Sequence, residues 1–381
     1  MLNTYYIIYG ITVLAYLWYR FFFRFLWELK RKYFGFMLKD YPYSVVVPVY
    51  NEKPELLEEC IKSLIDSAGT KEIIVVDDGS NNNCMEILAP YLKKGKIRVF
   101  LQSNKGKRYA QKLGIENARF PYIVTVDSDS VVETYSIQRL IQVFENPKIG
   151  AATGRIKALN RNRNWLTKMT EAFYLNASFF GRASLSSFNV VTCCSGALAA
   201  YRGDVIKPLM DKYVHQRFLG VECSFGDDRY LTNLVLMNNY GTSYVDEAVV
   251  YTEVPETFSK FWRQQLRWRT SMIRENIICL SFAWKRSFIL CLESFWNLFI
   301  PYFSLPARVF VLVLLIYYPW EIFSFLLGIL TVGIIRNLLL AFEDRKSFIY
   351  SLLYVFVSEF ILYWLYFIAL FQLKGKSWGT R

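Results

Sequence analysis

Two long stretches with almost no charge constrain this chain most, because such stretches are typical of segments that cross a membrane. Residues 288–342 contain four formally charged side chains, and residues 348–373 contain one. About 20 consecutive apolar residues span a bilayer as a helix, so residues 286–373 are predicted to form three or four transmembrane helices. The expected spans are 286–304, 306–319, 320–341 and 348–372. Charged side chains are costly in lipid, so we expect those in this block to line a path or to pair with one another: Glu293, Arg308, Glu321, Arg336 and Glu359.

The N-terminus has the pattern of an uncleaved membrane anchor. Residues 2–19 carry no charge, and the basic residues come after them, between positions 20 and 39. A cleavable signal peptide has its positive charge before the apolar stretch. We therefore expect a transmembrane helix with its basic flank at residues 1–27. The positive-inside rule places the N-terminus outside the cell and both the following domain and the basic tail, 374–381, in the cytoplasm. A cytoplasmic tail requires an even number of later spans, which favours four.

Composition narrows the function classes. The chain has 45 Lys and Arg against 32 Asp and Glu, a formal net charge of +13, and 54% of its residues are hydrophobic. So apolar a chain is not a disordered protein. Nucleic-acid binding is disfavoured because the basic residues cluster at membrane flanks without a recognition motif. The single histidine, His215, argues against a hydrolase that uses a histidine base. An anionic membrane face and a phosphorylated substrate remain as reasons for the charge.

Residues 41–257 read as a cytoplasmic α/β domain. Three short runs rich in β-branched residues, 43–50, 72–77 and 122–127, predict strands, and residues 54–67 between the first two predict a helix. Continuous apolar strands that alternate with helices indicate a parallel, doubly wound, Rossmann-like sheet. Ligands bind beyond the carboxyl ends of the strands in such sheets.

Two acidic turns follow predicted strands. Asp77-Asp78-Gly79-Ser80 ends one strand, and Asp127-Ser128-Asp129-Ser130 ends another. An Asp that directly follows a strand can bind the base or ribose of a nucleoside. Two Asp at i and i+2 in a turn can hold a hard divalent cation, which in turn neutralises a diphosphate. Each motif alone is also ordinary turn chemistry. Their joint placement after two strands of one sheet indicates a binding site.

Two further motifs could supply a general base and a phosphate contact. Asp227 and Asp228 are adjacent carboxylates, which can form a surface ion pair with the Arg that follows or supply a general base for a sugar hydroxyl. Lys107 and Arg108 end a basic run that is either solvated or cradles phosphates.

The segment 258–285 is predicted to form amphipathic interface helices. Helical spacing puts Gln264, Arg267 and Trp268 on one face. An amphipathic helix that lies on the bilayer explains this composition. The same three side chains also suit an acceptor sugar and a diphosphate, through ring stacking, hydroxyl bonding and anion pairing.

Taken in order, the motifs VVVPVYNE, VVDDGS, DSDS, GDDR and QQLRW resemble those of processive, inverting family 2 glycosyltransferases. NKGKR, CCSGALAAYR at 193–202 and the terminal Trp-Gly-Thr-Arg are most similar to hyaluronan synthases, with chitin and chitooligosaccharide synthases close to them. The resemblance implies an α/β GT-A fold combined with transmembrane and interfacial helices. It also implies UDP-sugar donors, Mg²⁺ or Mn²⁺, and a growing polysaccharide as the acceptor.

The resemblance also implies residue roles. Asp77 would contact uracil, with Asp78, Lys107 and Arg108 near the nucleotide. Asp127 would lie by the donor and, with Asp129, hold the metal. Asp228 would be the base, with Asp227 and Arg267 counted as catalytic beside it. The acceptor and diphosphate would be held by Gln264, Arg267 and Trp268, with Ser195 and Gly196 lining the acceptor site. The tail 374–381 would act as a cytoplasmic gating loop through Trp378 and Arg381.

Three departures leave the polymer open. Ala197 stands where hyaluronan synthases usually have Pro, Asp227 stands where they have Glu, and one predicted span precedes the domain instead of two. The predicted product is hyaluronan, from UDP-N-acetylglucosamine and UDP-glucuronate, made and secreted at the plasma or inner membrane in contact with lipid. One alternative is a chitin or chitooligosaccharide synthase that uses UDP-N-acetylglucosamine alone. Another is a transporter or channel with a degenerate nucleotide-sensing domain. The oligomeric state is not indicated.

Overall fold

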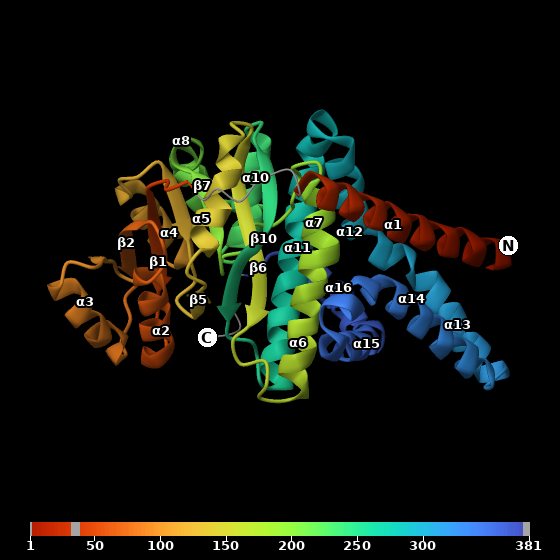
Figure 1. Ribbon diagram of the computed structural model, residues 1–381. Coiled ribbons are helices and arrows are strands. Elements are labelled where there is room, and N and C mark those ends of the chain that lie inside the picture. The colour runs from red at the N-terminus through yellow and green to blue at the C-terminus, as the bar shows by residue number, and fades with distance from the viewer. Residues whose placement is uncertain (1, 32–38, 376–381) are drawn as a thin grey trace.

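The computed structural model describes residues 2–31 and 39–375 (Figure 1). An α/β domain lies at one side, and helix α1 (Leu2–Arg31) and the C-terminal helices extend from the other. Trp378 and Arg381 lie outside the described residues, so the gating tail stays a prediction.

The domain is built on one eight-stranded sheet with the order β3-β2-β1-β4-β7-β6-β10-β5. Strands β1, β2, β3, β4, β6 and β10 run in one direction, whereas β7 and β5 run antiparallel to their neighbours. The α/β class and the three predicted strands are confirmed. The sheet was expected to be parallel throughout, but two of its strands, β5 and β7, are antiparallel. The bounds are β1 Tyr43–Val49, β2 Thr70–Asp77, β3 Arg98–Leu101, β4 Tyr122–Thr125, β5 Ser130–Val132, β6 Ile149–Ala158, β7 Ala199–Arg202 and β10 Gly241–Thr252, with a separate pair β8 Arg217–Phe218 and β9 Val221–Glu222.

Helices cover both faces of the sheet. Successive residues of a strand point to opposite faces, so Val45 and Val47 pack in the core with α2, while Val46 packs with α4 and α10. All seven residues of β1 are buried, as expected for a strand covered on both sides. The helices and helical turns of the domain are α2 Pro54–Ile65, η1 Asn83–Leu88, α3 Ala89–Lys93, α4 Lys107–Asn117, α5 Ser136–Ile141, η2 Gln142–Glu145, α8 Gly203–Ile206, η4 Lys207–Leu209, α9 Met210–Val214 and α10 Asp227–Met237.

Two long helical segments run side by side at the edge of the domain (Figure 1). One joins α6 (Trp165–Asn176), the π-helical turn η3 (Ala177–Arg182) and α7 (Ala183–Ser186). The other is α11 (Phe258–Arg286), a single 29-residue helix that contains the whole segment, 258–285, predicted to form interface helices. The segment 165–186 was not predicted as a helix.

The C-terminal block is helical throughout its described length. Within the described residues, two continuous helices are long and apolar enough to cross a membrane, Phe288–Tyr317 and Glu321–Glu343. A third arises if Arg345–Phe360 and Leu362–Phe371, bent by 50°, form one span. Helix α1 is not among them. Fewer spans result than the four expected because predicted spans 286–304 and 306–319 form one continuous run. The elements are α12 Phe288–Phe303, α13 Leu305–Tyr317, α14 Glu321–Glu343, α15 Arg345–Phe360, η5 Leu362–Trp364 and α16 Leu365–Phe371.

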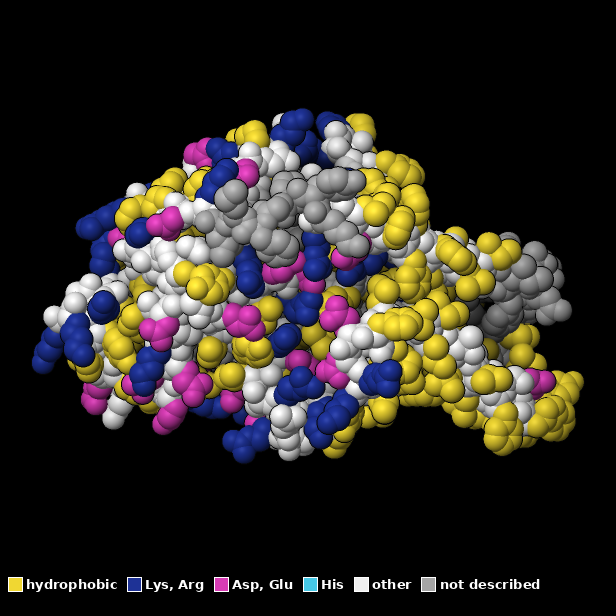
Figure 2. Space-filling model, in the orientation of Figure 1, with side chains coloured by type: hydrophobic (Ala, Val, Ile, Leu, Met, Phe, Trp, Pro, Cys, Tyr) yellow, Lys and Arg dark blue, Asp and Glu magenta, His cyan; other side chains and the backbone are white. Residues whose placement is uncertain are grey.

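The surface and the buried charges agree with a lipid-facing block. Hydrophobic side chains dominate the helical extension in Figure 2, whereas charged side chains are scattered over the α/β domain. Arg308 pairs with Glu359 at 2.6 Å, as the pairing prediction expected. Glu293 pairs instead with the buried Arg20 of α1, which joins the first helix to α12.

Candidate active site

Five predicted residues meet at the carboxyl ends of the strands. Lys107, the first residue of α4, places its Nζ 2.7 Å from Asp127 Oδ1 and 3.9 Å from Asp227 Oδ2. Gly196 lies against the same groups, because a Cβ at this position would stand 2.9 Å from Asp228 Oδ1, 3.0 Å from Lys107 Nζ and 3.1 Å from Asp127 Oδ1. Segments around positions 107, 127, 196 and 228 therefore build one cluster of charge.

The cluster perturbs its own proton affinities. Burial raises the pKa of Asp228 to about 6, with Lys107 opposing the rise and Asp127 and Asp227 adding to it. Burial alone would lower the pKa of Lys107, but the three carboxylates raise it overall. A carboxylate with a pKa near neutral is suited to accept a proton and release it again. Asp228 thus has the environment of a general base.

Arg108 is held inside the protein. Its guanidinium is 3.3 Å from Asp227 Oδ1 and donates hydrogen bonds to the carbonyls of Tyr213 and Phe225. The side chain is buried, and its cation lies over the rings of Tyr213 and Tyr230. Its predicted place near the nucleotide is untested. The contacts that the structure shows make it a support for the loop that precedes Asp227.

Asp77 ends β2, and Asp78 follows it beside the loop that leads to Lys107. Asp78 accepts hydrogen bonds from the Gln102 side chain and from the backbone N–H groups of Lys105 and Gly106, at 2.6 to 2.9 Å. It therefore fixes the basic loop that leads to Lys107. Asp77 Oδ1 accepts from the Ser80 N–H at 3.0 Å. Asp77 is the carboxylate predicted to meet uracil, and Asp78 positions the loop beside it.

The Asp127-Ser128-Asp129 turn supplies hard oxygen ligands of the kind that Mg²⁺ and Mn²⁺ prefer. Ser128 Oγ donates to Glu52 Oε2 at 2.7 Å, and both side chains are buried. Asp129 Oδ1 accepts from the hydroxyls of Ser130 and Thr252. Within the described part of the chain, no three His, Cys, Asp or Glu side chains group as a metal site. A cation here would take two carboxylates from the protein and the rest of its ligands from a diphosphate and water.

Helix α11 places Trp268 and Arg267 beside α6. The Trp268 ring stacks on Phe173, with centroids 6.3 Å apart, and lies 6.1 Å from Tyr174. Burial and Asp129 raise the pKa of the Tyr174 phenol, whereas Arg267 lowers it. Tyr174 thus lies within electrostatic range of both the predicted metal ligand and the predicted diphosphate ligand. Among the described residues, the buried side-chain oxygen of Gln264 has no hydrogen-bond partner.

Comparison with known proteins decides the family. The model of glycosyl transferase family 2 matches residues 44–209. The hyaluronan synthase of Streptococcus pyogenes is 33% identical over 98% of this chain and 90% of its own length. The chain belongs to glycosyltransferase family 2. It is therefore an enzyme that takes its sugar from a nucleotide donor, and within the family it is hyaluronan synthase-like and processive.

One further sequence relative and one solved structure are also similar to this chain. An N-acetylglucosaminyltransferase of Mesorhizobium japonicum is 34% identical over 89% of the chain and 81% of its own length. A mannosyltransferase of Pyrobaculum calidifontis, solved with GDP-mannose and Mn²⁺, superposes with a TM-score of 0.59 at 18% identity over 95% of this chain and 99% of its own. The latter likeness confirms the GT-A fold.

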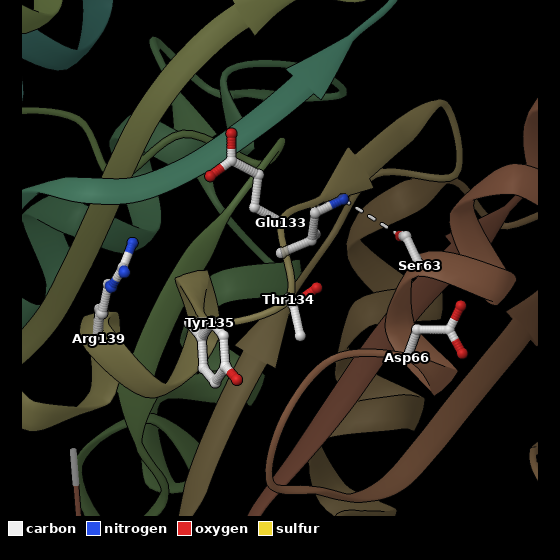
Figure 3. Close-up of a pocket in the computed structure, with 7 residues that line it drawn as sticks. Ser63, Asp66, Glu133, Thr134, Tyr135 and Arg139 are labelled. Atoms are coloured by element: carbon white, nitrogen blue, oxygen red, sulfur yellow. Dashed lines mark hydrogen bonds between the residues drawn. The ribbon is translucent and has the colours of Figure 1, made fainter.

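A hollow outside the charge cluster has no predicted site residue in its lining. It encloses about 490 Å³ and is lined by Ser63, Asp66, Val132, Glu133, Thr134, Tyr135 and Arg139. Figure 3 shows these side chains spread around an open surface, with Ser63 bonded to the backbone at Val132. The predicted site residues lie elsewhere, in the charge cluster at the strand ends.

Sequence reasoning missed Glu52 as a contributor to the family 2 site. It follows β1, and its carboxylate fixes the Asp-Ser-Asp turn through Ser128. The signal was present, because an acid directly after a buried parallel strand lies at the ligand-binding edge of the sheet. In the sequence, Asn51 and Glu52 stood out only as the end of the VVVPVYNE motif.

Proposed function

We propose that this glycosyltransferase polymerises hyaluronan from UDP-N-acetylglucosamine and UDP-glucuronate. The observation that carries the proposal is the 33% identity to a hyaluronan synthase, which extends over nearly the whole chain. A likeness confined to the catalytic domain would support sugar transfer alone. Its extension through the membrane block supports polymer synthesis with secretion.

In the proposed reaction, Asp228 accepts the proton of the acceptor hydroxyl as that oxygen attacks the anomeric carbon of the donor. The bond to the UDP oxygen breaks on the opposite face, so the configuration inverts. Lys107, within 2.7 Å of Asp127, is placed to pair with the departing diphosphate. Mg²⁺ or Mn²⁺, held by Asp129 and Asp127, would neutralise the same leaving group.

The remaining predicted residues bind and orient. Asp77 would bond to uracil, with Asp78 holding the neighbouring loop. Gln264, Arg267 and Trp268 would hold the acceptor terminus, and its hydroxyl would meet Asp228 beside Ser195 and Gly196. Because Gly196 has no side chain, the acceptor can approach the charge cluster closely.

The proposed setting is the plasma or inner membrane. The catalytic domain, 41–257, and the tail, 374–381, would lie in the cytoplasm and the N-terminus outside. Residues 1–27 and 286–373 would contact lipid, with 258–285 at the interface and the tail closing the site through Trp378 and Arg381. The two or three apolar helices of the C-terminal block support membrane association.

A chitin-type synthase is the second candidate. The Mesorhizobium japonicum N-acetylglucosaminyltransferase is as similar in identity as the hyaluronan synthase, and Ala197 and Asp227 depart from the hyaluronan synthase pattern. The transporter alternative has less support, because the carboxylates Asp127, Asp129, Asp227 and Asp228 are all present.

A donor test separates these candidates. Purified protein in lipid, supplied with Mg²⁺, would receive radiolabelled UDP-N-acetylglucosamine, UDP-glucuronate, or both. We expect high-molecular-weight product only with both donors, and complete digestion of that product by a hyaluronan-specific lyase. Polymer from UDP-N-acetylglucosamine alone would replace the proposal with the chitin-type reaction.

A further inference from the structure

The loop that leads into α10, where Asp227 and Asp228 form the first turn, is fixed from two sides at one carbonyl group. Arg108 Nη2, from α4, donates to the Phe225 carbonyl at 3.2 Å, and Arg274 Nη2, from α11, donates to the same oxygen. Phe225 lies two residues before Asp227. Two buried guanidinium groups therefore converge on the backbone immediately ahead of the proposed base.

Gly226 shows how tightly α11 packs against this loop. It has a φ of +84°, a left-handed conformation that favours glycine. A Cβ at this position would lie only 2.8 Å from Arg274 Nη2, and closer still to Ser271 Oγ. The backbone that begins α10 thus rests directly on two side chains of α11.

The Arg274 side chain is buried and is held by several partners. Its side chain is 1% exposed, and its guanidinium lies 4.9 Å from the Phe225 ring centroid. Its Nε donates to Glu275 Oε1 at 3.2 Å, and Glu275 in turn accepts from the side chains of Gln216 and Asn233. A charged group with this many fixed partners has little freedom to move.

We propose that Arg274 is a positioning residue for the general base. Arg274 and the Gly226 contact join two elements into one rigid unit. One is the helix that carries Gln264, Arg267 and Trp268, and the other is the first turn of α10, which carries Asp228. The acceptor-binding side chains and the base therefore keep a constant relative position. This inference rests on the proposed role of Asp228.

Arg286 offers a matched control. It lies on the same helix and donates to the Leu236 carbonyl at 2.9 Å, at the other end of α10. It also donates to the Asn239 side chain at 2.7 Å. Both arginines join α11 to α10 through a carbonyl group, but only Arg274 does so next to the base.

The test compares Arg274→Lys, Arg274→Met and Arg286→Lys in the full-length enzyme in lipid. We expect kcat for UDP release to fall about 10- to 100-fold for the Arg274 variants, because a displacement of about 1 Å can cost that much. Lys should retain more activity than Met, since it keeps one donor for the carbonyl. The donor KM and the Kd of UDP should stay near wild type in all three, and Arg286→Lys should keep its kcat.

Two outcomes overturn the inference: an unchanged kcat for Arg274→Met in folded protein, or an equal loss in Arg286→Lys. If the Arg274 variants do not fold, Ser271→Val provides a second test. It keeps Arg274 and adds a methyl group to the side chain that packs against Gly226, so the same fall in kcat at constant donor KM is expected. Wild-type kcat for folded Ser271→Val would then refute it. Asp228→Asn, assayed in parallel, separates the two claims: if it remains active, the proposed base is wrong, whatever Arg274 does.

Discussion

Gly196→Ala probes the geometry of the charge cluster with a single methyl group. That methyl would stand 2.9 to 3.1 Å from three charged atoms, on Asp228, Lys107 and Asp127. Ordinary contacts lie at about 3.5 Å, so these groups must separate by about 0.5 Å or the 193–197 loop must retreat. Displacements on this scale at reacting groups reduce rates by about 10- to 100-fold. We expect kcat for UDP release to fall by that amount.

The assay follows UDP release at saturating donor and, separately, UDP binding by calorimetry. The control is Gly181→Ala, because no atom of the described residues, other than the backbone of its own helix and its chain neighbours, lies within 4 Å of a Cβ built there. We expect the control to match wild type and both variants to bind UDP. Wild-type turnover of Gly196→Ala would show that the three side chains do not need their observed spacing, and the reasoning would fail.

Three further predictions follow from the same geometry. Ser128→Ala removes the bond to Glu52 and loosens the predicted metal-binding turn, so Mn²⁺ affinity measured by electron paramagnetic resonance in the presence of UDP should fall about tenfold. Unchanged affinity, equal to that of the exposed control Ser281→Ala, would contradict this expectation. Trp268→Ala should shorten or abolish polymer on a sizing gel, whereas Trp284→Ala, 66% exposed on the same helix, should not; equal product lengths would remove Trp268 from the acceptor site. The base works deprotonated, and burial raises the pKa of Asp228 to about 6. The value of kcat/KM should therefore fall as the pH decreases below about 6. A bound cation would move this fall to lower pH. Lys107→Met should move that limb to higher pH, since Lys107 lowers this pKa, and an unmoved limb would exclude Asp228 as its source.

The strands and acidic turns were readable in the sequence because their signals are local. β1 and β2 are runs of Val and Ile flanked by turn residues, and the Asp127 turn follows directly from its strand. The shared direction of the strands places both turns at one edge of the sheet, which predicted a binding site there. That part of the fold follows from period and spacing alone.

The missed parts depend on contacts between distant segments. β7 is four residues, Ala-Ala-Tyr-Arg, without a β-branched side chain, and its antiparallel place between β4 and β6 is set by its neighbours. Arg108 was assigned to the nucleotide by its neighbour in the motif, but its contacts with Asp227 and with two carbonyls more than a hundred residues away come from the tertiary fold. Likewise, the partner of Glu293 is Arg20, from the other end of the chain.

The central claim is that a half-buried carboxylate, Asp228, acts as the base for polymer synthesis in this family 2 enzyme. Incorporation of radiolabelled sugar by Asp228→Asn, with both UDP-sugars and Mg²⁺ present, tests it most directly. The account predicts loss of polymer while UDP binding stays near wild type, because the substitution keeps the shape and removes the base. Polymer synthesis by Asp228→Asn at a substantial fraction of the wild-type rate would contradict it.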